Sequence, residues 1–104
     1  MLTTAKKRIE LGNHKELPAV TVAATSTLVL AANPSRKTAI LQASSANTET
    51  LFFAIGRDKT AVVDFGIAID PGGIYVIGPD DWTGEAIYMV CASGGMTCFV
   101  SESE

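Results

Sequence analysis

The chain contains 104 residues, a length that fits one domain with one modest core. Hydrophobic residues make up 47% of it and charged residues 18%, below the roughly 25% of a typical soluble domain, so one interpretation is that a partner covers part of the surface. No apolar run approaches the roughly 18–20 residues of a membrane-spanning helix, and the basic N-terminus precedes no apolar core of a secretory signal. We therefore expect a protein that is made in the cytoplasm and has no membrane partner.

Charge is divided unevenly along the chain. Residues 1–37 carry six Lys and Arg against two Glu, a net +4, whereas residues 38–104 carry two against nine acids, a net −7. The basic front and the acidic body are expected to attract each other, within one chain or between copies, unless these are only solvated charges. Because the acidic body would repel phosphate and no aromatic-rich basic stripe occurs, no nucleic acid partner is expected.

Residues 1–17 are predicted to form an N-terminal arm. Leu2, Ala5 and Ile9 make only a weak helical face, and we expect the arm to be partly extended. Pro18 marks the first break, because the residue before a proline is pushed out of the helical region. Residues 18–104 are then expected to form a single domain.

After Pro18 the chain alternates between short apolar, β-branched segments and turn signals. This pattern, with no helical periodicity between the segments, predicts an all-β fold. We expect an antiparallel β-sandwich or a jelly-roll-like barrel of about eight short strands, with the extended arm attached. The eight segments are 19–24, 26–31, 37–44, 50–56, 66–70, 73–78, 85–92 and 96–102.

Proline and glycine fall between these segments, where turns require them. Asn33-Pro34 is expected to start a turn, and Pro71-Gly72 suits the two central positions of a type II turn.

Gly94-Gly95 predicts a two-residue hairpin loop, in which Cys91 would face Cys98 across two antiparallel strands. Both faces of that strand pair would be apolar, which is typical of strands buried on both sides. One predicted face holds Met89, Cys91, Cys98 and Val100, and the other holds Tyr88, Val90 and Phe99.

The two cysteines are expected to be free, buried thiols that pack as small apolar groups. Directly opposite Cβ atoms lie about 4.5–5.5 Å apart, slightly long for a disulfide, although a bridge in an oxidising medium stays open. Their spacing is not a zinc signature.

No catalytic or metal-binding constellation is evident, so we expect neither an enzyme nor a cofactor. His14 is the only histidine, and it lies in the polar arm. Asp80, Asp81 and Glu85 could gather around calcium, but their spacing matches no known metal loop and favours a plain acidic loop.

Arg36 and Lys37 stand between a turn signal and an apolar run. The segment lacks the glycines of a phosphate-binding loop, and a strand rather than a helix follows it. Arg36 is therefore expected to pair with a carboxylate, within the body or on a neighbour. Trp82, in an acidic loop, is either tucked against the core or an interface anchor.

Three segments of the chain resemble a group of short virion proteins of tailed phages and prophages. They are residues 28–45 with the Asn-Pro-x-Arg strand entrance, residues 66–90 with the Pro-Gly-Gly-x-Tyr and Trp-Thr-Gly turns, and residues 93–102 with the terminal Ser-Gly-Gly. The resemblance covers roughly residues 28–102, and the arm and the cysteine pair lie outside it or depart from it.

The resemblance implies a capsid decoration (cement) protein that binds the outer surface of a phage head and stabilises contacts between major capsid subunits. Virion location, a major capsid protein partner and a homotrimer would follow. The alternative is a small β-module of a head fibre or tail that displays loops to a host surface or glycan. The candidate interface residues are Lys6, Lys7, Arg8, Arg36, Lys37 and Trp82.

Overall fold

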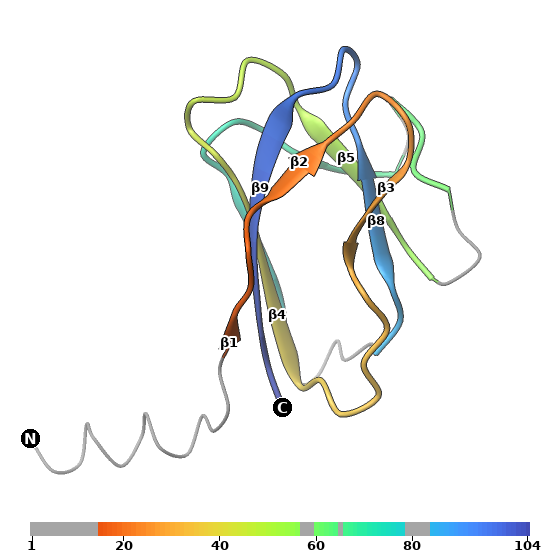
Figure 1. Cartoon of the computed structure of the whole chain (residues 1–104), viewed down its shortest axis with the longest axis vertical. Helices are drawn as coiled ribbons and strands as arrows, with labels where there is room; N and C mark the ends of the chain where they lie inside the picture. Colours follow the sequence, from red (N-terminus) through yellow and green to blue (C-terminus); the bar gives the residue numbers. More distant parts are fainter. Residues whose placement is uncertain (1–14, 57–59, 65, 79–83) are drawn as a thin grey trace, which may run out of the picture.

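The computed structural model describes residues 15–56, 60–64, 66–78 and 84–104, and these residues form nine β-strands (Figure 1). Within this described part, no helix is long and apolar enough to cross a membrane. The strands are β1 (Lys15–Glu16), β2 (Val20–Val22), β3 (Thr27–Leu30), β4 (Thr38–Ala43), β5 (Leu51–Ile55), β6 (Ile67–Ile69), β7 (Ile74–Ile77), β8 (Ile87–Val90) and β9 (Met96–Ser103).

The strands form two antiparallel sheets packed as two layers (Figure 1). Sheet A has the order β1-β9-β4-β7, and β2 also pairs with β9. Sheet B has the order β3-β8-β5-β6. Each of the eight segments predicted from the sequence overlaps one of the strands β2–β9, so the all-β sandwich is confirmed.

The strands pair from the two ends of the series inward, as in a long antiparallel hairpin that is folded over. Strands β2, β3, β4 and β5 pair in turn with β9, β8, β7 and β6. Additional pairs, β4 with β9 and β5 with β8, complete the two layers, which have five strands in sheet A and four in sheet B. This strand order is a jelly roll, the second of the two forms named in the fold prediction.

Side chains alternate between the core and the outside most regularly along β4, as the period of two requires. In β4, Ala39, Leu41 and Ala43 are fully buried, and Ile40 points outward between them. Phe53 of sheet B meets Tyr75 of sheet A edge to face, with ring centroids 5.1 Å apart. Contacts of this kind join the two layers into one hydrophobic core.

The Pro71-Gly72 turn forms as predicted. The amide of Gly73 donates to the carbonyl oxygen of Asp70 (2.8 Å), and Gly72 has φ +81°, the value that a type II turn requires at its third residue. This turn connects β6 of sheet B to β7 of sheet A.

The predicted hairpin at Gly94-Gly95 is wrong. Both glycines have positive φ, but the strands on either side of them lie in different sheets, β8 in sheet B and β9 in sheet A. The amide of Gly95 donates to the carbonyl oxygen of Val22 instead of closing a turn, and Cys98 pairs with Val20 and Ala43. A pair of glycines permits a tight turn without requiring it, and the long-range pairing with β2 and β4 decided the path.

The four side chains of the first predicted face come from two different sheets and not from one strand pair. Cys91, Cys98, Met89 and Val100 do line one core, but they reach it from opposite sheets. At the end of the predicted arm, Lys15 and Glu16 pair with β9 and Leu17 packs against the core, and the rest of the arm lies outside the described residues.

Candidate functional site

A turn places Arg36 at the entrance to β4. The amide of Arg36 donates to the carbonyl oxygen of Asn33 (3.0 Å), and the amide of Ser35 donates to Asn33 Oδ1 (3.1 Å). The predicted Asn-Pro turn is thereby confirmed. Gly84 lies against it, and a Cβ at that position would stand 2.6 Å from the Asn33 carbonyl oxygen. A residue with a side chain could not take the place of Gly84 without moving the turn.

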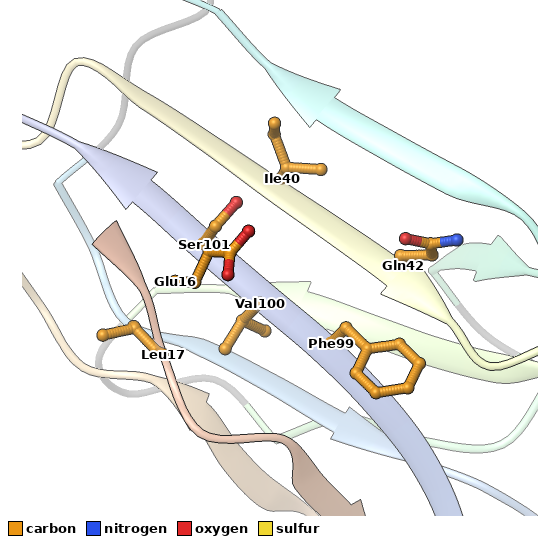
Figure 2. Close-up of a pocket in the computed structure, with 7 residues that line it drawn as sticks. All are labelled: Glu16, Leu17, Ile40, Gln42, Phe99, Val100 and Ser101. Atoms are coloured by element: carbon orange, nitrogen blue, oxygen red, sulfur yellow. The ribbon is translucent and has the colours of Figure 1, made fainter. Parts of the chain in front are cut away.

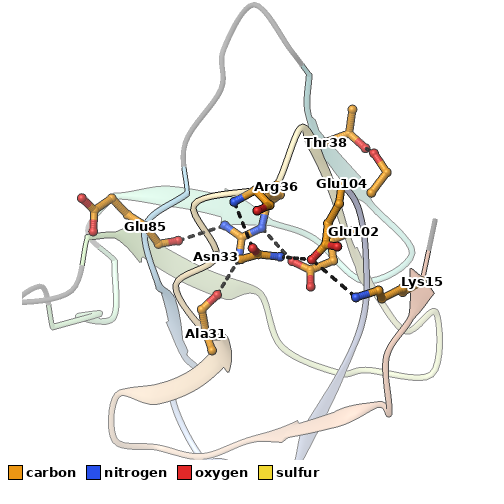
Figure 3. A network of polar contacts seen from close by, with 10 residues as sticks. Lys15, Ala31, Asn33, Arg36, Thr38, Glu85, Glu102 and Glu104 are labelled. Atoms are coloured by element: carbon orange, nitrogen blue, oxygen red, sulfur yellow. Dashed lines mark hydrogen bonds and ion pairs between the residues drawn. The ribbon is translucent and has the colours of Figure 1, made fainter. Parts of the chain in front are cut away.

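The guanidinium of Arg36 is buried inside its own chain, with 1% of the residue exposed (Figure 3). Nε donates to Glu102 Oε1 (2.9 Å), Nη1 donates to the carbonyl oxygen of Glu85 (3.0 Å), and Nη2 donates to the carbonyl oxygen of Ala31. Charge-assisted hydrogen bonds are strong where water is excluded. Arg36 therefore ties β9 to the segment after β3 and to the segment before β8.

The last residues of the chain join the same cluster. Glu104 Oε2 accepts a hydrogen bond from Asn33 Nδ2 (2.8 Å) and lies 3.4 Å from Lys15 Nζ. These contacts, the Asn33 hydrogen bond first and the Lys15 ammonium second, hold the pKa of Glu104 below its ordinary value. We call Lys15, Asn33, Arg36, Glu102 and Glu104 the polar end (Figure 3).

The prediction that Arg36 contacts a partner is wrong, because a side chain enclosed by its own chain offers no surface. Of the two partners left open for it, a carboxylate of the same body is the one found. Lys37 is exposed at the start of β4, where its amide donates to the carbonyl oxygen of Ser103 (2.7 Å), so its side chain is accessible. The other candidate interface residues, which are Lys6, Lys7, Arg8 and Trp82, lie outside the described residues, as do His14, Asp80 and Asp81.

The uneven charge along the chain acts within the molecule. In the part of the chain that the structure describes, both ion pairs join a cation from residues 1–37 to an acid from residues 38–104. They are Lys15 with Glu104 and Arg36 with Glu102. The basic front and the acidic body therefore attract each other inside one chain at these two points.

The outward face of sheet A is rich in apolar side chains, although outward positions of a solvated sandwich are ordinarily polar. Ile74 is 59% exposed, Val76 is 56% exposed and Phe99 is 47% exposed. The strand register sets them in two rows across the sheet, which we call the outward face of sheet A. One row is Val76, Ile40, Ser101 and Glu16, and the other is Ile74, Gln42 and Phe99.

A hollow of about 310 Å³ opens on this face (Figure 2). Its floor is at Val100 and the small side chain of Ser101 on β9, and its walls come from β1, β4 and the remainder of β9. The residues that line it are Glu16, Leu17, Ile40, Gln42, Phe99, Val100 and Ser101.

The outward face of sheet B is also apolar. Leu28, 48% exposed, stands opposite Tyr88, and Tyr88 stands opposite Ala54. The next row crosses Val90, Phe52 and Ala68, of which Val90 is buried. Both layers of the sandwich thus have exposed apolar side chains on their outward sides, at Ile74, Val76 and Phe99 in sheet A and at Leu28 in sheet B.

Sequence reasoning missed these faces as sites, although a signal was present. Residues 74–77 are Ile-Tyr-Val-Ile, so the side chains on both sides of this strand are apolar. Residues 51–55 and 87–90 show the same feature. A strand solvated on one side would alternate between apolar and polar residues. The signal was recognised only for the strands around the cysteines.

Cys91 and Cys98 are free and buried, as predicted. The thiol of Cys91 lies 3.3 Å from the carbonyl oxygen of Val22, and burial raises the pKa of Cys98 to about 11. Among the described residues, no three His, Cys, Asp or Glu side chains are grouped closely enough to hold a metal ion.

Comparisons of this chain with protein-family models, with curated proteins and with solved structures found no match. The resemblance of residues 28–102 to phage virion proteins therefore remains a prediction. What the molecule offers for recognition is its geometry: two apolar outward faces on a sandwich whose end is closed by a buried ion pair.

Proposed function

We propose that this protein is a capsid decoration protein, a structural component that binds the outer surface of a phage head and stabilises contacts between major capsid subunits. The observation that carries the proposal is the apolar character of both outward faces, at Ile74, Val76 and Phe99 on sheet A and at Leu28 on sheet B. Contiguous exposed apolar patches commonly mark a surface that another protein covers, because burying them removes apolar area from water. A binding role rather than catalysis is part of the proposal, as are virion location and the homotrimer.

The low charge content supports the same proposal. A chain with 18% charged residues has few charged side chains to keep its surface in contact with water. Four of them form the two ion pairs of the polar end, within the same chain. A standard interface buries on the order of 800 Å² per partner, so several copies around a capsid axis would add up to a strong hold. The jelly roll occurs in viral capsid proteins but also in unrelated classes, so the fold alone adds little.

The proposal is tested on phage particles that carry the protein and on the same particles after its removal. We expect the stripped particles to release DNA at a lower temperature, and re-addition of the protein to restore the original temperature. An equal release temperature for stripped and complete particles would refute the decoration role.

Two matched variants test whether the apolar faces make the contact. Val76→Lys charges the outward face of sheet A, and Leu28→Lys charges the outward face of sheet B; both side chains are exposed in the single chain. At least one variant is expected to lose binding to stripped particles by tenfold or more, because a buried unpaired ammonium is strongly unfavourable. If both bind like the unchanged protein, the contact lies elsewhere.

The alternative function is a fibre or tail module. The fluorescence of Trp82, the single tryptophan of the chain, distinguishes this alternative from the decoration role. Under the decoration proposal the emission shifts to the blue when stripped particles are added and does not respond to glycans. A response to glycans without one to particles would favour the fibre or tail module.

A further inference from the structure

Strand β7 is an unprotected edge of sheet A. A sheet edge exposes backbone N–H and C=O groups to other strands, and proteins ordinarily block it with charges, prolines, bulges or a very short strand. Of the four strands at the ends of the two described sheets, three carry such a device. β1 is two charged residues with Pro18 close behind, β3 has a register shift between Leu28 and Leu30, and β6 is three residues long. β7 has four residues, no charge and no register shift.

The hydrogen bonds between β4 and β7 leave alternate residues of β7 with backbone groups that face away from the sheet. The amide of Ala43 donates to the carbonyl oxygen of Gly73 (3.0 Å), so these two positions form a hydrogen-bonded pair of the antiparallel ladder. Such pairs alternate along a ladder, so Tyr75, two residues after Gly73, also bonds to β4. The N–H and C=O groups of Ile74 and Val76 therefore point to the open edge, where no strand of the described residues pairs with them.

The same two residues have the most exposed large apolar side chains in the described part of the chain. At Ile74 and Val76, both the backbone groups and most of the side chain are thus left to water. A strand laid against this edge would meet both needs at once, because it supplies ladder hydrogen bonds and places its own side chains about 4.5–5.5 Å from theirs. The coincidence of open backbone groups and exposed apolar side chains points to a strand as the partner.

We propose that β7 pairs antiparallel with β7 of a second copy of this chain, so that the A sheets of the two copies join edge to edge. The two-fold axis stands perpendicular to the sheet beside Tyr75, and it sets Ile74 of each copy opposite Val76 of the other. Both residues of each such pair have edge-facing groups, so each pair exchanges both of its N–H to C=O hydrogen bonds. The contact is isologous, because each copy contributes the same strand.

The sequence of β7 matches a copy of itself in this register. An antiparallel ladder can shift only by two residues if bonded positions are to stay opposite bonded positions. The register centred on Tyr75 uses the open groups of Ile74 and Val76 in both copies, whereas a shift of two residues sets one of them opposite itself and the other opposite a residue outside β7. Facing β-branched side chains pack favourably across a ladder. An isologous contact brings like charges together, and β7 carries no charge to be repelled.

The contact is one strand wide, so its affinity comes mainly from main-chain hydrogen bonds and not from buried area. A strand of four residues is about 13 Å long, and its contact is smaller than the roughly 800 Å² per partner of a standard interface. The pair should therefore dissociate on dilution. Copies held side by side on a common surface would pair more readily than free chains, because their effective concentration is higher.

Analytical ultracentrifugation and amide hydrogen exchange by NMR test the pairing on the full chain, from micromolar to millimolar concentration and without any phage particle. We expect the mass to double with concentration. The amides of Ile74 and Val76 should exchange about tenfold more slowly, or slower still, once the pair forms. The amide of Tyr75 bonds to β4 in the single chain and should be protected at every concentration. This alternation is specific to edge pairing, because a contact between sheet faces adds no hydrogen bond to the edge amides.

Two variants break the edge. Val76→Pro removes an edge-facing N–H that makes no bond to β4, and Val76→Lys places a charge where two copies would meet. Both should remain at half the mass reached by the unchanged protein. Phe99→Lys is the matched control, because Phe99 is similarly exposed on the same face but lies on the inner strand β9. It should associate like the unchanged protein, and thermal unfolding in dilute solution should give Val76→Lys and Phe99→Lys nearly equal midpoints.

The proposal is overturned if the mass of the unchanged protein does not rise with concentration, if both Val76 variants associate as well as the unchanged protein, or if the exchange of the Ile74 and Val76 amides is the same in dilute and concentrated solution. Protection of these amides only in the presence of stripped particles would assign the edge to a strand of the capsid and overturn the pairing between copies. A pair that forms but ignores particles would support the pairing and refute the decoration role, so the two failures are distinguishable.

Discussion

The polar end and the outward face of sheet A invert the usual placement of side chains. Arg36, a permanent cation, is 1% exposed, whereas Ile74, a pure hydrocarbon, is 59% exposed. Both are next to β4, because Arg36 precedes this strand in the chain and Ile74 pairs with Gln42 within it. The charged residue is enclosed because three elements of the chain supply acceptors for it. Among the described residues, the apolar side chain of Ile74 stays 59% exposed at the edge strand β7 of sheet A.

The contrast separates what holds this molecule together from what it offers to others. Within one chain, long-range order at the polar end depends on charge pairing between the front and the end of the sequence. Between molecules, the accessible chemistry is mainly apolar, so association should depend weakly on salt. A protein that used its charges for binding would show the opposite behaviour.

The largest expected effect is at Arg36. Replacement by Ala leaves the Glu102 carboxylate buried without its cation and two carbonyl oxygens without a donor. Removal of one partner of a buried pair typically lowers the free energy of unfolding by about 3–5 kcal/mol. That loss is a large part of the roughly 5–15 kcal/mol available to a domain, and urea unfolding measures it.

Lys37→Ala is the control for Arg36→Ala, since the neighbouring side chain is exposed. Its effect should stay within about 0.5 kcal/mol. Replacing Arg36 and Glu102 together by Met and Leu should recover part of the loss, because no buried charge then remains. Equal midpoints for Arg36→Ala and Lys37→Ala would show that the polar end does not hold the fold.

The second effect compares two isoleucines. Ile87 is fully buried between the sheets, and Ile74 projects from sheet A. Ile87→Ala should lower the free energy of unfolding by about 2–5 kcal/mol, because it removes buried methyl groups and leaves a cavity. Ile74→Ala should change it by less than about 0.5 kcal/mol in dilute solution.

The third effect is chemical. Burial raises the pKa of Cys98 from 9.0 to about 11, so its thiol should resist alkylation in folded protein at mildly alkaline pH and react on unfolding. Because the folded pKa is the higher one, the associated stability is complete below about 9 and is lost as the pH rises toward about 11. Mass spectrometry after a timed alkylation measures the reaction. Rapid labelling of native Cys98 would contradict its burial.

The smallest effect is at the C-terminal end. The pKa of Glu104 is lowered from 4.5 by Asn33 and Lys15, so its contribution to stability is present above the ordinary value and is lost as the pH falls through the lowered one. An NMR titration should find the Glu104 pKa below 4.5 and find it raised in both Asn33→Ala and Lys15→Ala, because each variant removes a contact that lowers it. A normal Glu104 pKa in the unchanged protein would mean that the contact is not formed in solution.

Prediction from the sequence succeeded where the information is local. The eight segments with period-two alternation all contain strands, and Asn33-Pro34 and Pro71-Gly72 both form the expected turns. Prediction failed where a choice between distant partners was needed. Gly94-Gly95 was interpreted as a hairpin, and the strands on either side of it instead join opposite sheets.

The candidate site divides in the same way. The need of Arg36 for a carboxylate could be predicted from its position at a strand entrance, but the partner, Glu102, lies 66 residues further on. The apolar outward faces could be predicted from strands whose side chains are apolar on both sides, such as residues 74–77. Which of these side chains lie next to one another could not be predicted. Only the register between β4, β7 and β9 brings Ile40, Val76 and Ser101 into one row.

By itself, the sequence determined that this chain forms short strands with turns between them, because alternation and the φ preferences of Pro and Gly act within a few residues. Tertiary structure alone decided the rolled strand order, the burial of Arg36 and the apolar outward faces. The physical reason is that strand pairing uses backbone groups common to every residue, so the pairing is settled by how the whole set of apolar faces can be buried together.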